Sequence, residues 1–424
     1  MKLLIVGSGG REHALAWKAA QSPRVDTVYV APGNAGTALE DKLRNVPIDA
    51  QAIPELVQFA RDHHVDLTLI GPETPLVAGI VDAFAAAGLR CFGPSQAAAQ
   101  LEGSKTFAKD FMARHHIPTA RYRSFTDLDQ AKAYIQAQGA PIVIKADGLA
   151  AGKGVVLAQT RAAANAAAAD MLTGNAFGDA GRRIVIEDQL HGEEVSFICI
   201  VDGQTALPLA TTQDHKAAYD NNTGPNTGGM GAYSPAAIIT PALRQRIMRD
   251  VINPTVAGLS AMGHPFTGLL YAGLMITADG APQVLEFNVR GGDPETQVIM
   301  PRLNADLVTL CEAALAGEIN RMRLDWTPQP AVGVVMAAAG YPGPHSTGDI
   351  IHGLAQAQAA GCKVFHAGAA ANERGDIVTN GGRVLCVTAL GDDISAAQRA
   401  AYRGVRCIHW RGARFRSDIG QQAI

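Results

Sequence analysis

Short apolar runs alternate with amphipathic segments over residues 1–103, and this alternation constrains the fold more than any other feature of the chain. The apolar runs are "KLLIV", "TVYV", "DLTLI" and "LRCFG". Helical patterns such as "REHALAWKAAQ" and "IPELVQFARDHH" separate them. Strands connected through helices of this length form βαβ units, in which the strands run parallel. Residues 1–103 are therefore predicted to form a parallel, Rossmann-like sheet.

The rest of the 424-residue chain divides into two further predicted domains. Residues 104–325 combine strands with glycine-rich loops, and a helix that Ser104 is expected to cap opens the segment. Within it, residues 120–190 form a lobe whose glycine loop and flanking turns predict mobility. "DWTPQP" resembles a linker, and the strand-rich runs after it predict a small α+β domain over residues 326–424. The predicted fold class is thus α/β and α+β, in several domains.

Composition limits the expected partners and location. With 47% hydrophobic and 18% charged residues, the chain is typical of a globular protein. A net charge of -3 disfavours a general nucleic-acid binder, because such proteins carry a basic footprint. Six cysteines without CxxC spacing indicate neither a zinc site nor a disulfide framework. No stretch is long enough for a signal peptide core or a membrane span, so a cytoplasmic protein without nucleic-acid or membrane partners is expected.

The loop "VGSGGREHA" follows the first strand and opens a helix, a position where backbone N–H groups and the helix dipole favour anions. A dinucleotide fingerprint, G-x-G-x-x-G, would need a glycine where Glu12 stands. The second strand also ends in "YVAPGNAG" and not in an acidic residue placed for a ribose hydroxyl, so NAD binding is disfavoured. The loops "GNAG" and "GPETP" are expected at the same sheet edge, and three such loops suit a sugar phosphate.

A second glycine loop, "IVIKADGLAAGKGV", places Lys145 at the end of a strand. Gly148, Gly152, Lys153 and Gly154 follow before the next strand. Glycines let the backbone close over phosphates, and a lysine supplies a mobile positive charge. A Walker A loop would need Ser or Thr where Gly154 stands, so this is a phosphate loop of another kind.

The stretch "VIEDQLHGEEVS" offers backbone groups at Asp188 to Leu190 as an edge for an adenine. The carboxylates of Glu187 and Glu194 stand on either side of this edge. An ordinary charged turn between two strands would have the same composition. Taken alone, the stretch therefore leaves a nucleotide edge and a plain turn as alternatives.

The stretch "LEFNVRGGDPETQ" places Glu286 and Asn288 two residues apart on an expected strand, so their side chains share one face. One charged and one neutral oxygen ligand, with no His or Cys nearby, suit Mg²⁺, which takes its remaining ligands from water and phosphates. The alternative is an exposed polar strand face. The apolar "QVLEF" lead-in favours a metal site that works together with a nucleotide.

Residues 213–235 are predicted to form a long loop rich in Gly, Asn, Thr and Pro, and a structureless loop of this length inside a domain is usually functional or disordered. Asp214, His215 and Lys216 precede its glycine-rich part. His215 alone is a weak catalytic candidate, because isolated histidines more often serve as core or capping groups. The loop is expected to fold over a ligand.

Taken together, these motifs resemble those of the ATP-grasp enzymes, and specifically the phosphoribosylamine-glycine ligases, or glycinamide ribonucleotide synthetases. The resemblance extends from residue 9 to about residue 385 in the family's order. It rests on the stretches "GGREHA", "APGNAGT", "GPETPL", "LEGSK", "PIVIKADGLAAGKGV", "DHK", "TGPNTGGMGAYSP", "EFNVRGGDPETQ" and "VTNGGRVL". It implies a two-lobed ATP-grasp domain between the other two domains.

The resemblance also implies the reaction and its partners. ATP, glycine and 5-phosphoribosylamine would give glycinamide ribonucleotide, ADP and phosphate through a glycyl phosphate, with Mg²⁺ or Mn²⁺ bound by Glu286 and Asn288. A monomer is expected. The implied ATP contacts are Lys105, Lys145, Gly148, Gly152, Lys153, Gly154, Glu187, Asp188, Leu190 and Glu194. The implied catalytic residues, which hold glycine, are Arg290, Asp293 and Asp214. The implied substrate contacts are Gly9, Gly10, Arg11, Glu12, Gly33, Asn34, Glu73 and Lys216.

Two positions depart from the family pattern. The family usually has "RFGDPE" and "DHKR", whereas this chain has Gly291 and Ala217 at the aromatic and arginine positions. If those side chains order the substrate pocket, the affinity for glycine is altered. Activity is still expected, because the charged and metal-binding positions remain.

Two other functions compete with ligation. The first βαβ units could serve a nicotinamide oxidoreductase, although Glu12 and the missing acidic residue count against it. Gly291 and Ala217 would also suit a non-catalytic or altered-substrate ATP-grasp homologue. Binding of NAD(P)H would support the oxidoreductase, and the absence of substrate-dependent phosphate release would support the homologue without this activity.

Overall fold

The computed structural model of the protein describes residues 1–149, 154–173 and 178–424. The N-terminal part is the five-stranded sheet β3-β2-β1-β4-β5, and every neighbouring pair of strands is parallel. The prediction of a parallel α/β sheet is therefore confirmed. The strands are β1 (Lys2–Gly7), β2 (Thr27–Pro32), β3 (Leu43–Asn45), β4 (Leu67–Ile70) and β5 (Cys91–Phe92). The helices are α1 (Gly10–Ala20), α2 (Ile53–Asp62), α3 (Glu73–Val77), α4 (Ile80–Ala86) and α5 (Gln96–Gly103).

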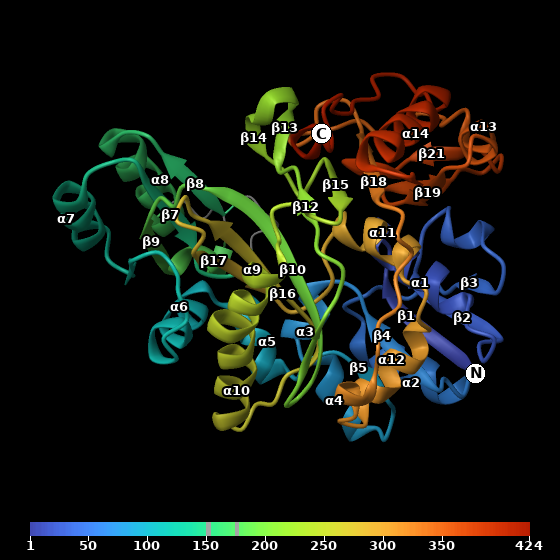
Figure 1. The fold of residues 1–424 in the computed structure, drawn as a ribbon, viewed down its shortest axis with the longest axis horizontal. Coiled ribbons are helices and arrows are strands. Elements are labelled where there is room, and N and C mark those ends of the chain that lie inside the picture. Colours follow the sequence, from blue (N-terminus) through green and yellow to red (C-terminus); the bar gives the residue numbers. More distant parts are fainter. Residues whose placement is uncertain (150–153, 174–177) are drawn as a thin grey trace.

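The predicted lobe at residues 120–190 projects from the body of the molecule on the left of Figure 1. Its antiparallel sheet has the order β6-β9-β7-β8, and it encloses a core of its own that includes Phe125, Ile135, Ile144 and Ile186. The lobe thus has a hydrophobic core separate from those of the rest of the molecule. The elements are β6 (Tyr122–Phe125), α7 (Leu128–Gln138), β7 (Ile142–Ala146), β8 (Val155–Ala158), α8 (Arg161–Thr173) and β9 (Ile184–Asp188).

The central sheet, of order β11-β10-β16-β17, connects the lobe to the rest of the molecule. Its strands are β10 (Glu193–Asp202), β11 (Ala206–Pro208), β16 (Thr267–Ile276) and β17 (Pro282–Asn288). Alternate side chains of β10 enter two different cores: Val195 and Phe197 pack in one, Ile198 and Ile200 in the other. Glu194 and Ser196 therefore share the second face. The surrounding helices are α6 (Lys105–Arg114), α9 (Pro241–Ile247), a π-helical segment (Met248–Ile252), α10 (Asn253–Ala261), α11 (Glu295–Ile299) and α12 (Leu307–Leu315).

Helix α6 begins where the sequence predicts. The Ser104 hydroxyl accepts a hydrogen bond from the Phe107 backbone N–H at 3.1 Å, which satisfies one of the free donors of the first turn. The helix ends at Arg114, before Pro118. A serine cap followed by apolar residues on one face is thus enough to place this helix from the sequence.

The C-terminal sheet has the order β12-β15-β18-β22-β19 and crosses the predicted boundary at residues 325 and 326. Its first two strands, β12 (Gln213–Asp214) and β15 (Gly231–Ser234), come from the segment predicted to be one structureless loop, which also forms the hairpin β13 (Ala217–Tyr219) and β14 (Thr223–Asn226). That prediction is wrong because backbone pairing with distant strands orders a sequence whose composition is typical of loops. The other elements are β18 (Ala331–Ala337), α13 (Leu354–Ala359), β19 (Lys363–His366), β20 (Ala369–Ala371), β21 (Ile377–Thr379), β22 (Arg383–Leu390) and α14 (Ile394–Cys407).

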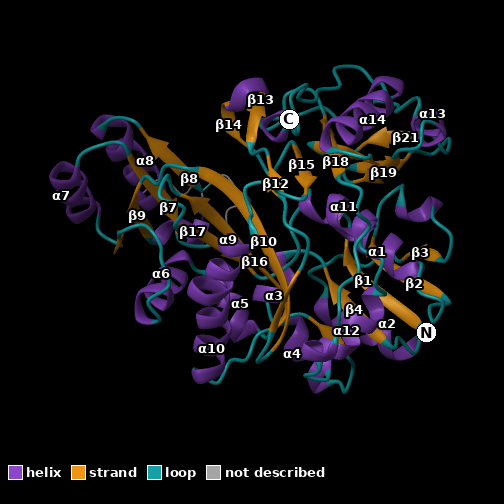
Figure 2. Ribbon diagram, viewed as in Figure 1, coloured by secondary structure: helices purple, strands orange, loops and turns teal. Residues whose placement is uncertain are grey.

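Figure 2 shows helices α13 and α14 beside the strands of this last sheet. Helix α14 starts at the cap Asp393, whose carboxylate accepts a hydrogen bond from Ala396 N–H at 2.6 Å. Ala397, Ala401 and Val405 recur every four residues and are buried. The predicted α+β character of the C-terminal part is confirmed.

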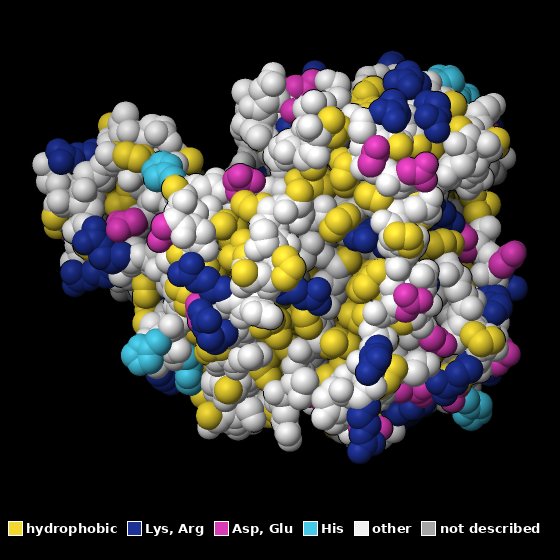
Figure 3. Space-filling model, viewed as in Figure 1, with side chains coloured by type: hydrophobic (Ala, Val, Ile, Leu, Met, Phe, Trp, Pro, Cys, Tyr) yellow, Lys and Arg dark blue, Asp and Glu magenta, His cyan; other side chains and the backbone are white. Residues whose placement is uncertain are grey.

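The visible face of the molecule mixes charged side chains of both signs (Figure 3). Basic and acidic groups are interspersed over the body, and the lobe stands apart from it. No helix in the described part of the chain is long and apolar enough to cross a membrane. The charges on this face thus form no single large basic or acidic patch.

Candidate active site

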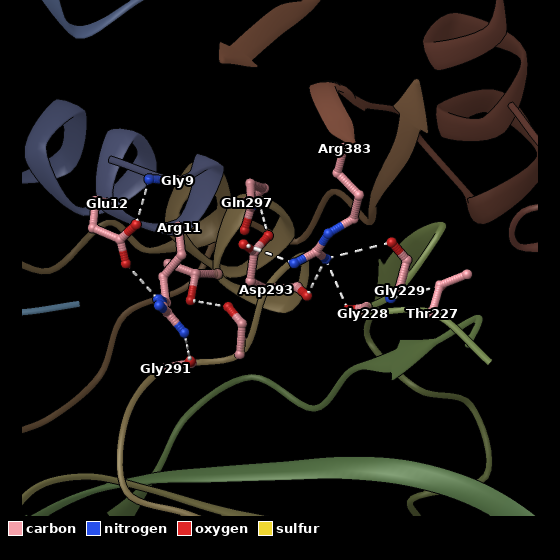
Figure 4. A network of polar contacts seen from close by, with 12 residues as sticks. Gly9, Arg11, Glu12, Thr227, Gly228, Gly229, Gly291, Asp293, Gln297 and Arg383 are labelled. Atoms are coloured by element: carbon pink, nitrogen blue, oxygen red, sulfur yellow. Dashed lines mark hydrogen bonds and ion pairs between the residues drawn. The ribbon is translucent and has the colours of Figure 1, made fainter. Parts of the chain in front are cut away.

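The loop after β1 is organised by the carboxylate of Glu12. Its Oε2 accepts a hydrogen bond from Gly9 N–H at 2.6 Å, and its Oε1 accepts one from Nε of Arg11 at 2.5 Å (Figure 4). A Cβ added at Gly71 would lie 2.0 Å from Glu12 Oε1, so this glycine makes room for the carboxylate. Glu12 thus fills the space and uses a donor that a dinucleotide-binding loop would offer to a phosphate. It also fixes the Arg11 guanidinium beside the loop.

Asn34, predicted to contact substrate, connects two parts of the molecule. Its Nδ2 donates to the backbone oxygens of Ser8 and His366, both at 2.8 Å, and its Oδ1 accepts from the N–H groups of Gly36 and Thr37. The side-chain amide is thus fully used inside the protein, because an amide carries two N–H donors and one oxygen with two lone pairs. Asn34 shapes the loop that begins at Gly33 and joins it to the C-terminal part.

Arg290 lies in a cluster of carboxylates. Its guanidinium donates hydrogen bonds to Glu73 Oε2 at 3.1 Å, Asn288 Oδ1 at 2.9 Å and the Gly291 carbonyl at 3.2 Å, and it pairs with Glu102 at 2.9 Å. Burial opposes ionisation of Glu73, but Arg290 and Arg11 lower its pKa to about 2. Burial raises the pKa of Glu102 to about 7 in spite of Arg290. Nη2 contacts both Asn288 and Glu102, so these four contacts engage four of the five N–H donors of the guanidinium and leave one on Nη1.

The two predicted metal ligands lie on one face of β17 and differ in their surroundings. Asn288 is buried, and its amide oxygen accepts a hydrogen bond from Arg290. An amide oxygen has two lone pairs, so the second one can bind a cation. Glu286 is partly exposed and, among the residues that the structure describes, forms no hydrogen bond or ion pair. A fixed amide oxygen beside an unpaired carboxylate is a hard donor set that fits Mg²⁺ or Mn²⁺.

The predicted phosphate-binding lysines converge on the end of β17 from two sides. Lys145 Nζ donates to the Leu285 carbonyl at 3.1 Å, and Lys105 Nζ donates to the Gly148 carbonyl at 3.1 Å. Burial lowers the pKa of Lys105, while the negative charge of Glu286 opposes that effect. Two cations and the carboxylate of Glu286 thus surround one point, which suits a polyphosphate with a divalent cation.

The carboxylate at the start of the predicted adenine edge is paired inside the protein. Glu187 is buried, and its carboxylate forms ion pairs with Lys145 and Lys109. Burial lowers the pKa of Lys109 to about 8, although Glu187 opposes this effect. Asp188 pairs with the exposed Arg121 at 3.1 Å. Asp188 still belongs to β9, and its N–H donates to the Arg121 carbonyl at 3.0 Å. The backbone of Gln189 and Leu190, which follow β9 outside strand pairing, is the part of this edge that stays available.

Two members of the predicted phosphate loop, Gly152 and Lys153, lie outside the described residues. Gly154 is described, and its carbonyl accepts a hydrogen bond from Ala146 N–H at 2.8 Å, which closes the β7–β8 hairpin. Gly148 packs against Ala180, because a Cβ added there would lie 2.7 Å from the Ala180 Cβ. The two ends of the loop are thus anchored on the lobe.

A second charged cluster lies where β10 faces β12. Lys216 forms ion pairs with Glu194 and, at 3.3 Å, with Asp214. Burial works against the charge on Lys216, but Asp214 and Glu194 raise its pKa. Glu295 lies nearby and accepts hydrogen bonds from Ser196 Oγ at 2.9 Å and Tyr271 Oη at 2.8 Å. The predicted residues Asp214, Glu194 and Lys216 are therefore brought together in one cluster.

His215 is a core residue. It is 3% exposed, and its Nε2 accepts a hydrogen bond from Gly420 N–H at 3.3 Å. Burial, with the nearby charge of Arg416, lowers its pKa to about 4. A buried neutral imidazole with a backbone partner supports the structural interpretation of this residue.

Asp293 lies between the N-terminal loop and the C-terminal sheet (Figure 4). Its Oδ1 accepts a hydrogen bond from Gln297 Nε2 at 2.6 Å, and its Oδ2 accepts one from Arg383 Nη2 at 3.2 Å. Burial would raise the pKa of Asp293, but Arg383 and Arg11 hold it below the ordinary value. The charged form of Asp293 is thus favoured at the place where the N-terminal loop, the turn after β17 and the C-terminal sheet meet.

Comparison with known proteins places the chain in a family. Profiles of phosphoribosylglycinamide synthetase match residues 1–102 (N domain), 103–296 (ATP-grasp, or A, domain) and 331–422 (C domain). The chain belongs to the phosphoribosylglycinamide synthetase family. Phosphoribosylamine-glycine ligases of Vibrio vulnificus (strain CMCP6) and Escherichia coli (strain K12) are each 60% identical to it over 424 residues, which is 100% of this chain and 99% of each relative.

Solved structures agree with this assignment. Phosphoribosylamine-glycine ligase from Thermotoga maritima has a TM-score of 0.86 and 33% identity, and the match covers 99% of this chain and 100% of that one. A biotin carboxylase domain from Hydrogenobacter thermophilus shares the fold with a TM-score of 0.73 at 16% identity, covering 98% of this chain and 91% of that one. The chain is thus an ATP-grasp enzyme of the phosphoribosylglycinamide synthetase family.

The two departures from the phosphoribosylglycinamide synthetase pattern are accommodated in different ways. The Gly291 carbonyl accepts hydrogen bonds from both Arg11 and Arg290, at 3.2 Å each, so its backbone is held without an aromatic side chain. A Cβ at this position would lie 2.8 Å from Thr296 Oγ1. The Ala217 carbonyl accepts a hydrogen bond from the buried Arg416 at 3.2 Å. The backbone at both positions is thus fixed by arginines from elsewhere in the chain.

Sequence reasoning missed four polar residues of this region: Lys109, Glu102, Glu295 and Arg383. Glu102 stands in "LEGSK" and Arg383 in "VTNGGRVL", two stretches that carry the resemblance but in which these residues had no assigned role. A buried charge within an apolar run was the signal that could have identified Glu102 and Lys109. Arg383 could not be found this way, because its partners lie 90 and more residues away.

Proposed function

We propose that the chain joins glycine to 5-phosphoribosylamine at the expense of ATP, as the names of its relatives indicate for them. The products are glycinamide ribonucleotide, ADP and phosphate. The observation that carries the proposal is the convergence of Lys105, Lys145 and the Glu286–Asn288 pair at the end of β17. A polyphosphate bound there lies within the same interface as the N-terminal loop and the cluster around Lys216.

In the first step, a carboxylate oxygen of glycine attacks the γ-phosphorus of ATP, and the bond to the β-phosphate oxygen breaks to release ADP. The product is glycyl phosphate. Both reactants are anions, so positioning and charge neutralisation supply most of the acceleration. Lys105 and Lys145 hold the phosphates, the loop from Gly148 to Gly154 covers them, and the backbone of Gln189 and Leu190 meets the adenine.

Glycine is held by groups of both signs. The one donor of Arg290 that its contacts with Glu73, Asn288, Gly291 and Glu102 leave meets the glycine carboxylate, and Asp293 or Asp214 meets the ammonium group. The depressed pKa of Asp293 supports this role, because a charged carboxylate attracts an ammonium group. Glu194 and Lys216, which pair with each other, border the same space.

In the second step, the neutral amine of phosphoribosylamine attacks the carbonyl carbon of glycyl phosphate. The C–N bond forms, the C–O bond to phosphate breaks, and the amine nitrogen loses a proton. No side-chain nucleophile is needed. In this proposal Arg11 and the N–H of Gly10 bind the sugar phosphate, and the backbone of Gly9 and Gly33 borders it. Glu12, which accepts the Gly9 N–H, holds the loop and Arg11 in place together with Asn34 and Glu73.

Glu286 and Asn288 are the residues that would hold the divalent cation, Mg²⁺ or Mn²⁺. When bound, such a cation neutralises phosphate charge and orients the transferring group. Arg290 assists from the protein side, because its hydrogen bond to Asn288 Oδ1 fixes the orientation of the amide.

The proposal includes the setting in which the enzyme works. In this proposal the enzyme acts as a monomer in the cytoplasm. We keep residues 1–103, 104–325 and 326–424 as the proposed domains, with strands β12 and β15 of the middle segment joining the C-terminal sheet.

Phosphate release from MgATP tests the proposed function. Release is expected only when glycine and phosphoribosylamine are both present, and omission of either should reduce it to the rate with ATP alone. An unchanged rate with and without both substrates would instead favour the homologue without this activity.

A further inference from the structure

Arg383, the first residue of β22, brings together two segments that are far apart in the sequence (Figure 4). Its Nη1 donates to the carbonyls of Asp293 at 2.7 Å and Gly228 at 2.8 Å, and its Nη2 donates to Asp293 Oδ2 at 3.2 Å. The guanidinium is held over Gly228, where an added Cβ would lie 2.9 Å from the Arg383 Cζ. One side chain of the C-terminal sheet thus fixes both the Asp293 turn and the glycine-rich turn.

The glycine-rich turn passes this constraint on to the cluster around Lys216. Thr227 donates two hydrogen bonds to the Lys216 carbonyl, from its N–H and its Oγ1, both at 2.8 Å. Gly229 N–H donates to Thr227 Oγ1 at 3.0 Å, and a Cβ at Gly229 would lie 2.5 Å from the Pro294 Cδ. Gly228 N–H also donates to Tyr341 Oη at 3.2 Å. Contacts therefore continue from Arg383 through the turn to Lys216.

We propose that Arg383 is a positioning residue that sets the Asp293 carboxylate against the Asp214–Lys216 pair, and so makes the C-terminal domain part of the glycine-binding site. The inference rests on the proposed function, in which these groups hold glycine. A planar guanidinium suits the task because it donates to several oxygens in fixed directions, whereas a lysine ammonium does not. Arg383 acts through Asp293 and the turn and is not assigned a contact with substrate.

Replacement of Arg383 should affect glycine more than ATP. We expect Arg383→Gln to raise the KM for glycine by about 10- to 100-fold, the range for a lost positioning contact, and to leave the KM for ATP within about two-fold. Arg383→Lys should recover part of the lost glycine affinity, since lysine restores the positive charge but not the planar set of N–H donors. Arg399→Gln is the matched control: Arg399 is exposed on α14 of the same domain and hydrogen-bonds Ser395 at 2.7 Å.

A double-mutant cycle with Asp293→Asn separates positioning from general damage. If Arg383 acts through Asp293, the double variant should raise the KM for glycine by much less than the product of the two separate fold-increases. Parallel changes in all KM values with a lowered Tm, or an Arg383→Gln enzyme with wild-type constants, would overturn the inference. If Arg383→Gln does not fold, the same comparison is made with Arg383→Lys and with Gly228→Ala, whose Cβ displaces the guanidinium.

The wild-type enzyme, assayed in parallel, keeps this test distinct from that of the proposed function. A wild type without glycine-dependent ADP formation contradicts the proposed function and the inference with it. An active wild type combined with unaffected Arg383 variants contradicts the inference alone. Selective loss of glycine affinity with rescue by lysine supports both.

Discussion

At the end of β17, the guanidinium of Arg290 fixes the side chains around it. Arg290 is bound by Glu73, Glu102 and Asn288, and this arrangement fixes the Asn288 amide while Glu286 stays without a protein partner in the described residues. A partly exposed carboxylate that forms no hydrogen bond or ion pair with the described residues can receive a cation from solution. The central role of β17 in the proposed site therefore depends on Glu286.

Glu286→Ala should reduce kcat by at least about 100-fold, because the variant loses the charged ligand of the divalent cation that positions the phosphates. Initial rates at saturating substrates measure the effect, and Mn²⁺ binding in the presence of ATP gives a second reading. Glu193→Ala is the control, since Glu193 is the neighbouring glutamate of Glu194 on β10 and faces the other side of that sheet. Wild-type turnover in the Glu286 variant would remove the metal assignment.

The elements of the fold differ in how well the sequence predicts them. Helix α6 follows from the Ser104 cap, and the strands β1, β2 and β4 follow from short apolar runs separated by helices. Strands β12 and β15 could not be predicted, because their partners are β18 and each other, and pairing between distant segments overrides local composition. Periodicity and capping are local signals, whereas this sheet depends on contacts across the chain.

Some residues of the candidate site could be predicted from the local sequence, and others could not. Lys145, Glu286 and Asn288 stand at strand ends beside glycine loops, where local sequence indicates ligand contacts. The side-chain roles of Asn34 and Glu187 were not predictable, because the partners that occupy them, His366 and Lys109, come from other segments. Local patterns identify which groups a residue could bind, but they do not show which partners from distant segments bind it in the folded protein.

The lobe formed by β6 to β9 should respond to nucleotide. Lys145 on β7 bonds the Leu285 carbonyl of β17, so a polyphosphate bound at these residues bridges the lobe and the central sheet. We expect MgATP to slow hydrogen exchange of the backbone in β8, residues 155–158, because closure protects this strand at the edge of the lobe sheet. Exchange followed by mass spectrometry, with α14 as the internal reference, measures this effect. Equal exchange with and without MgATP would count against closure.

At the scale of the whole molecule, a buried polar cluster joins the N-terminal and C-terminal parts. His13 of α1 accepts a hydrogen bond from the His366 backbone at 2.9 Å, and Glu40 accepts from Lys363 and contacts His13 at 3.0 Å. Burial, with the charges of His13 and Lys363, lowers the pKa of His366 to about 3, although Glu40 opposes this shift. The neutral form of His366 is therefore favoured at the contact between the two parts.

Burial opposes ionisation of Glu40, but His13 and Lys363 lower its pKa to about 2, so acid should weaken this contact before it protonates Glu40. An unfolded histidine has a pKa of about 6.5, so the unfolded state binds the extra proton below that value while folded His366 stays neutral. The contribution is complete above pH 6.5 and is lost as the pH falls toward 3. Between pH 7.5 and 5.5 the free energy of unfolding should fall by about 1 kcal/mol through this group.

Urea unfolding of the wild type and of His366→Gln at the two pH values measures this contribution. The variant should show the smaller decrease, since glutamine does not titrate. His409→Gln is the control: His409 is exposed and stacks on His352 within the C-terminal part. Identical pH dependence in the wild type and the His366 variant would show that this histidine does not limit the contact.

The central claim is that glycine is activated as an acyl phosphate, and the fate of its carboxylate oxygen tests it most directly. With glycine labelled with ¹⁸O in the carboxylate, attack on the γ-phosphorus leaves one labelled oxygen in the phosphate when the amine displaces it. Mass spectrometry of the phosphate should therefore find one ¹⁸O for each glycinamide ribonucleotide formed. Phosphate without label from ¹⁸O-glycine, in an enzyme that still forms product, would contradict this account.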